Sequence, residues 1–160
     1  MLEKHEVFEI TDSDKTFGDV IANAPKEISE GIRSKNVIIL PSHNTTDEFY
    51  CGTLDTLDYL NDNGLSADVY ACDDDYKELS LHGAEIWLGT IIIKYVVIPV
   101  FCSVIGAYVY EKLKGVSGDQ ISMKVYVEKK DGTTSAIDFR GKIEDFDKAL
   151  KEIGKFHEGI

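Results

Sequence analysis

Polar side chains follow two predicted strands, at positions where they can bind a metal ion or a phosphate. Ser42, His43 and Asp47 come after the apolar strand 36–40, and an acidic run follows the strand 67–72. The acidic run consists of Asp73, Asp74 and Asp75. Ligands of open α/β sheets bind at the carboxyl ends of strands, which would bring these side chains to one site. Carboxylate oxygens suit Mg²⁺, and hydroxyl groups beside a helix N-terminus suit phosphate.

The same residue types also have an ordinary structural use. Ser, Asn, Thr and Asp form turns and cap helices, so the residues of both segments are also typical of ordinary loops. Ser42 and His43 are adjacent, which does not favour the arrangement of a catalytic triad. No phosphate-binding loop, nucleophile elbow or zinc-protease motif occurs. We therefore expect no catalytic residue, no enzymatic activity and no cofactor. A soluble ligand-binding or Mg²⁺-dependent hydrolytic α/β domain is the alternative.

The elements that position these residues alternate between strand and helix. The apolar strand 36–40, a helix over 46–62 and the strand 67–72 predict a βαβ unit with a right-handed crossover. A short strand, 6–10, precedes this unit. Residues 119–157 predict two strands, joined at Lys130-Asp131-Gly132, and then a helix. The fold class is α/β or α+β with a small mixed sheet.

The most apolar part of the chain lies between these two units. Residues 86–110 contain one charged residue, Lys94, and we expect a long hydrophobic helix over 84–113. The chain then divides into an α/β half, 1–80, this helix, and the ββα unit, which form one domain if the protein is soluble. About 20 apolar residues are enough for a helix to cross a bilayer. A helix that is apolar all round is either a membrane span or a core helix.

Three environments for this helix follow from its residues. Aromatic residues near both ends favour a membrane interface, whereas Lys94 and Pro99 oppose a simple span. Burial in the chain's own fold is the second environment. The third is an oligomer interface, in which Ser103 and Gly106 allow close approach of a second copy. The residues assigned to this association helix are Trp87, Lys94, Pro99, Phe101, Ser103, Gly106, Tyr108 and Tyr110.

Composition excludes some partners and favours one compartment. The formal charge is -12, and the nearest approach to a basic cluster is Lys112, Lys114 and Lys124, so nucleic acid is not an expected partner. Three separated cysteines provide no zinc-site spacing and are typical of reduced thiols. Those cysteines are Cys51, Cys72 and Cys102. With no signal-peptide pattern at the N-terminus, we expect a cytoplasmic or cytoplasmic membrane-associated protein.

The segment 98–114, IPVFCSVIGAYVYEKLK, resembles a pattern in small, mostly uncharacterised prokaryotic proteins. Their pattern is an apolar helix with a proline start and a Tyr-rich, charged exit, followed by a β-hairpin and a helix. The tail MKVYVEKKDGTTSAIDFRGKIEDFDKALKEI is similar to theirs, and the resemblance covers residues 84–155. It implies an accessory or effector-associated component of bacterial islands, including antiviral defence or conflict systems. It implies no catalytic residue.

Taken together, the sequence predicts a non-enzymatic association protein. Its apolar helix would bind a bilayer, a partner protein or further copies of the same chain.

Overall fold

A computed structural model describes residues 7–41, 48–49, 52–71, 76–78, 85–113 and 120–156. Its strands are β1 (Val7–Ser13), β2 (Val37–Leu40), β3 (Glu48–Phe49), β4 (Ala67–Val69), β5 (Lys77–Glu78), β6 (Glu85–Lys94), β7 (Gln120–Glu128) and β8 (Thr134–Lys142). Its α-helices are α1 (Phe17–Ala22), α2 (Lys26–Ile32), α3 (Thr53–Asp62), α4 (Ile98–Tyr108) and α5 (Ile143–Lys155). The short 3-10 helix η3 (Tyr95–Val97) and the π-helical turn η4 (Val109–Leu113) flank α4.

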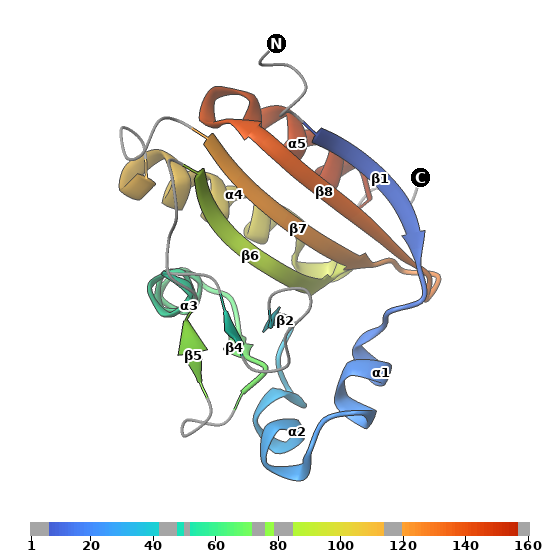
Figure 1. Ribbon diagram of the computed structural model, residues 1–160. Coiled ribbons are helices and arrows are strands. Elements are labelled where there is room, and N and C mark those ends of the chain that lie inside the picture. The colour runs from blue at the N-terminus through green and yellow to red at the C-terminus, as the bar shows by residue number, and fades with distance from the viewer. Residues whose placement is uncertain are drawn as a thin grey trace.

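One mixed sheet of six strands organises the molecule (Figure 1). Its order is β1-β8-β7-β6-β2-β4, so strands from both halves of the sequence hydrogen-bond within it. β6 runs parallel to β7 and antiparallel to β2, and β1 pairs antiparallel with β8 at one edge. β3 and β5 form a separate two-stranded sheet. The predicted α+β class with a mixed sheet is confirmed.

The two predicted supersecondary units are present. β2 and β4 are parallel and joined through α3, as expected for the βαβ unit. β7 and β8 form a hairpin that leads directly into α5. In its turn, Gly132 has φ 90° and Asp131 accepts a hydrogen bond from the Thr133 N–H at 2.9 Å. Asp and Gly therefore supply the backbone geometry that the sequence predicted.

The predicted helix 46–62 is too long at its N-terminal end. Glu48 and Phe49 form β3, and α3 begins only at Thr53. Gly52 precedes it with φ 87°, a left-handed conformation that interrupts a right-handed helix. Residues 46 and 47 lie outside the described ranges.

The predicted helix over 84–113 is wrong in its first third. Residues 85–94 form β6, and only after η3 does the chain become α-helical, at Ile98. β-branched side chains at 90–93 favour a strand. Pro99 stands in the first turn of α4, where its missing N–H costs nothing, so it starts a helix instead of interrupting one. In the described part of the chain, no helix is long and apolar enough to cross a bilayer.

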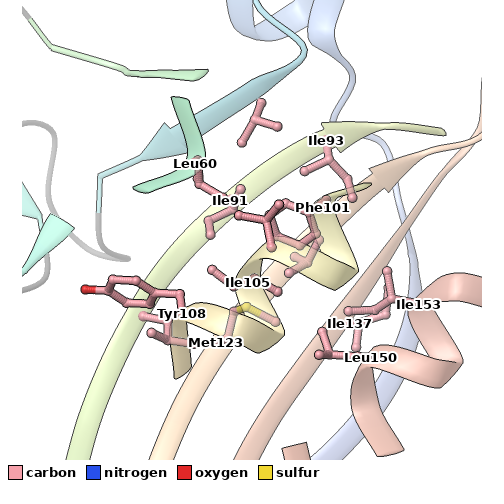
Figure 2. Packing of buried hydrophobic residues seen from close by; sticks show 14 of the residues in the cluster. Leu60, Ile91, Ile93, Phe101, Ile105, Tyr108, Met123, Ile137, Leu150 and Ile153 are labelled. Carbon is pink, nitrogen blue, oxygen red and sulfur yellow. The ribbon is translucent and has the colours of Figure 1, made fainter. Parts of the chain in front are cut away.

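Much of the apolar run is packed inside the protein's own fold. α4 and α5 cover one face of the sheet, behind β6, β7 and β8 in Figure 1. The main core joins these helices to the strands, and Figure 2 shows Ile91, Phe101 and Ile105 within it. α1 and α2 cover the opposite face at β2 and β6, where Phe17 and Ile32 pack with Ile92.

Candidate functional site

The carboxyl ends of β2 and β4, the strands that precede the two polar segments, lie at one edge of the sheet. β2 and β4 are parallel, and the Tyr70 N–H donates to the Ile39 carbonyl at 2.9 Å just beyond β4. The carboxyl ends of both strands therefore lie side by side. The predicted ligands themselves lie outside the described residues. They are Ser42, His43, Asp47, Asp73, Asp74 and Asp75.

No other metal site emerges from the part of the chain that the structure describes. Within it, no group of three His, Cys, Asp or Glu side chains is placed to hold a metal ion. Cys102 is a free, half-buried thiol whose Sγ lies 3.6 Å from the Leu150 carbonyl oxygen. Burial raises the pKa of this thiol to about 12, so it is not a thiolate near neutral pH. Cys51 and Cys72 fall outside the described ranges.

The residues assigned to the association helix do not share one environment. Trp87 and Lys94 belong to β6, and the Lys94 Nζ lies 4.9 Å from the centre of the Phe17 ring. Phe101 and Tyr108 are buried in the main core. These four residues therefore do not form part of an external helical surface.

Gly106 permits the close helix contact that was predicted, but with a helix of the same chain. A Cβ built on Gly106 would lie 3.0 Å from the Leu150 Cδ1 of α5. The small residue therefore lets α4 approach α5 within the monomer. The close approach does not require a second copy.

One side of the segment from η3 to η4 remains exposed and apolar. Val96, Val100 and Tyr110 are 60%, 42% and 64% exposed, and Pro99 and Ser103 are also exposed. Val96, Val100, Ser103 and Tyr110 follow one another at intervals of four, three and seven residues, as on one side of a helix. We call these five residues the association surface. No charged residue occurs from position 95 to position 110.

An acidic region lies on α3, the helix that packs against α4. α4 packs against α3, where the Tyr108 hydroxyl donates to an Asp55 carboxylate oxygen at 2.9 Å. Asp55, Asp58 and Asp62 are exposed on α3. Residues 36–76 contain no Lys or Arg and nine acidic residues: Asp47, Glu48, Asp55, Asp58, Asp62, Asp68, Asp73, Asp74 and Asp75. Most of the net charge of -12 is therefore concentrated in this part of the chain.

A second exposed apolar feature lies on β1 and was not predicted from the sequence. Phe8 and Ile10 of β1 are 45% and 44% exposed at the edge of the six-stranded sheet. The strand was predicted from its alternating polarity, but alternation alone does not tell whether a strand lies at an edge. The exposure of its two large apolar residues was therefore not predicted.

Comparisons with known proteins give this chain no relatives. No family model matches it, and neither a curated protein nor a solved structure does.

Proposed function

We propose that this chain is a non-enzymatic accessory protein that binds another protein through the association surface. The observation that carries the proposal is an exposed, charge-free side of α4 in a chain that is otherwise strongly acidic. Exposed apolar patches mark interaction sites, and the centres of protein interfaces are poor in charge and rich in aromatic residues. Tyr110 also lies in a π-helical turn, a rare feature that is frequent at functional sites.

The neighbouring charges indicate the chemistry of the partner. α3 places Asp55, Asp58 and Asp62 beside α4, and no basic residue accompanies them between 36 and 76. A partner with an apolar centre and a rim of Lys or Arg would match both features. Such rim charges act mainly on the association rate, so binding would weaken as salt increases.

The biological setting rests on the resemblance of residues 84–155. It supports a cytoplasmic accessory or effector-associated role in a prokaryotic defence or conflict system. The most informative partners to test are therefore the products of the genes that neighbour this one.

The test is pairwise binding of the purified chain to each neighbouring gene product, by titration calorimetry. Val96→Asp and Val100→Asp should each weaken the interaction about tenfold or more, because a charge in a desolvated interface centre is costly. Ser34→Asp is the matched control, since it adds the same charge at an exposed turn position two residues after α2. It should leave the affinity unchanged.

Two results would contradict the proposal. One is a bound partner whose affinity is the same for the wild type, Val96→Asp and Val100→Asp. The other is equal loss in all three variants, Ser34→Asp included, which would indicate a general charge effect. Circular dichroism and thermal unfolding confirm beforehand that each variant is folded.

A Mg²⁺-dependent hydrolytic or ligand-binding domain is the second candidate, and the parallel pairing of β2 and β4 favours it. Because of this pairing, the segments that contain Asp47 and Asp74 begin at the same edge of the sheet. Titration with Mg²⁺ should then raise the melting temperature of the wild type but not of Asp74→Ala. An unchanged melting temperature in both proteins removes this candidate.

A further inference from the structure

β1 is an edge strand whose only charged side chains are Glu9 and Asp12. Within the described residues, no strand lies beyond β1, and its seven residues pair with β8 without a bulge. It contains neither proline nor lysine, the residues that commonly block strand addition. Such a strand offers free backbone donors and acceptors along one side.

The exposed side chains of β1 lie on the helix-covered face of the sheet. Phe8 pairs with Phe139 and Ile10 pairs with Ile137, and both partners are buried beneath α5. Opposite residues of an antiparallel pair point to the same face. Phe8 and Ile10 therefore lie beside α5, where nothing in the described structure covers them fully.

α5 carries a row of charges that is complementary to a second copy of itself. Leu150 faces α4, because its Cδ1 would meet a Cβ on Gly106. At 100° per residue, positions two and five residues to either side of Leu150 point away from α4. In chain order these positions are Asp145, Lys148, Glu152 and Lys155. When two copies are related by a two-fold axis at the level of Leu150, Asp145 of one copy lies opposite Lys155 of the other. Lys148 likewise lies opposite Glu152.

The centre of this row coincides with the centre of β1. Ile10 is the middle residue of β1 and pairs with Ile137. Figure 2 shows Ile137 grouped with Leu150 and Ile153 of α5, and all three belong to one core cluster. At the other end of this packing, the Phe139 and Phe146 rings lie 5.6 Å apart. A two-fold axis beside Ile10 therefore passes close to the midpoint of the charged row.

We propose that two copies of this chain pair through β1, antiparallel and centred on Ile10, to form one continuous twelve-stranded sheet. This register keeps both helix layers on the same face, whereas a one-residue slip would place them on opposite faces. It sets Ile10 against Ile10 of the second copy and Glu9 against Thr11, so no like charges stand directly opposite.

The dimensions of this arrangement fit the side chains. The two β8 strands lie three strand spacings apart, about 14 Å. Because α5 packs over β8, the two α5 helices are separated by a similar distance. Helices in direct contact lie about 8–10 Å apart, so a gap of a few ångströms remains between the two α5 helices. Phe8, Ile10 and Asp12 from both copies point into this gap, and the charged rows close it from above. In the monomer, this row contains the in-helix ion pairs Lys148–Asp145 and Lys155–Glu152.

Disulfide trapping tests the register directly, in a background with Cys51→Ser and Cys72→Ser. Ile10→Cys should oxidise to a covalent dimer, because opposite residues in antiparallel strands lie about 4.5–5.5 Å apart at Cα. Phe8→Cys alone should stay uncoupled, since Phe8 lies about 14 Å from its own copy. A mixture of Phe8→Cys and Asp12→Cys chains should couple, because these positions face each other in the proposed register.

Analytical ultracentrifugation of the uncrosslinked protein provides the thermodynamic test. Lys148→Glu should raise the dimer dissociation constant about tenfold, since it affects two symmetric charge pairs. Lys148→Glu combined with Glu152→Lys should restore it. Both positions are outside the core, and unfolding measurements show whether the variants stay folded.

The outcomes separate cleanly. A chain that sediments as a monomer at every accessible concentration overturns the proposal, as does a dimer that traps equally well at residues 8 and 10. This dimer does not depend on the proposed function, because it leaves the association surface of α4 uncovered. Failure of one experiment therefore leaves the other intact.

Discussion

The two parts of the apolar run are similar in composition and different in structure. In β6, the consecutive residues Ile91, Ile92 and Ile93 are all fully buried, because helices cover both faces of the sheet there. In α4, Phe101 is buried, whereas Val100 and Ser103 are exposed. A covered central strand has no exposed side, whereas a helix on a sheet surface has one.

Local signals, and not hydrophobicity, separate these two parts. Gly89 has φ 115° at a register shift between β6 and β7, a conformation that suits glycine and ends any continuous helix. Pro99 marks the start of α4. Between them, consecutive β-branched residues favour a strand. The structure of this mostly apolar 25-residue run is therefore predicted better from Gly89 and Pro99 than from its length.

The largest effects should come from truncating consecutive residues in each part. Ile91→Ala and Ile92→Ala should each lower the free energy of unfolding by about 2–5 kcal/mol, because truncating either buried side chain leaves a cavity. In α4, Phe101→Ala should cost about 3–5 kcal/mol, whereas Val100→Ala should change stability by less than about 0.5 kcal/mol. Urea unfolding measures all four variants. Equal costs for Val100→Ala and Phe101→Ala would show that α4 has no exposed side.

A glycine substitution distinguishes a strand from a helix by the sign of its effect. Gly89→Ala should destabilise the protein by about 1–3 kcal/mol, because an L side chain is strained at positive φ. Within a continuous helix, the same change would instead stabilise by about 0.5–1 kcal/mol. Gly154→Ala in α5 is the control, since a Cβ there meets no atom within 4 Å. It should be stabilising, and a stabilising Gly89→Ala would overturn the assignment of β6.

The units that are predictable from sequence are those bounded by turn-forming or helix-breaking residues. The β7–β8 hairpin follows from Asp131 and Gly132, and the break between α1 and α2 follows from Pro25, which precedes α2. The βαβ unit follows from two short apolar strands separated by a helical pattern. In each case the signal lies within a few residues, so no tertiary contact is needed to read it.

The missed features depend on tertiary context. β6 is apolar at consecutive positions because two layers cover it, and periodicity alone does not distinguish this pattern from a buried helix. The exposure of Phe8 and Ile10 depends on β1 lying at the sheet edge, which follows from strand order and not from composition. At the candidate ligand site, the sequence predicts the shared sheet edge of β2 and β4, and the side chains beyond it stay a prediction.

A smaller effect concerns the attachment of α4 to α3. Tyr108→Phe removes the hydrogen bond to Asp55 and should cost about 1 kcal/mol at neutral pH. Burial, aided by Asp55, raises the pKa of Tyr108 from 10.0 to about 12. Between these values the unfolded chain loses the proton that the folded protein keeps, so stability falls as pH rises. Tyr108→Phe should flatten this fall in unfolding curves taken from pH 9 to 12, and an unchanged slope would contradict it.

The smallest effect tests the end of β6, where the run carries its single charge. The Lys94 ammonium lies 4.9 Å from the centre of the Phe17 ring, and half-exposed contacts of this kind contribute about 0.5–1 kcal/mol. Lys94→Met and Phe17→Leu should therefore show a coupling of about this size in a double-mutant cycle. The exposed Lys151→Met in α5, paired with the same Phe17→Leu, should show none. A coupling of zero for both lysines would mean that Lys94 points to solvent alone, and that the charge does not hold the end of β6 against α1.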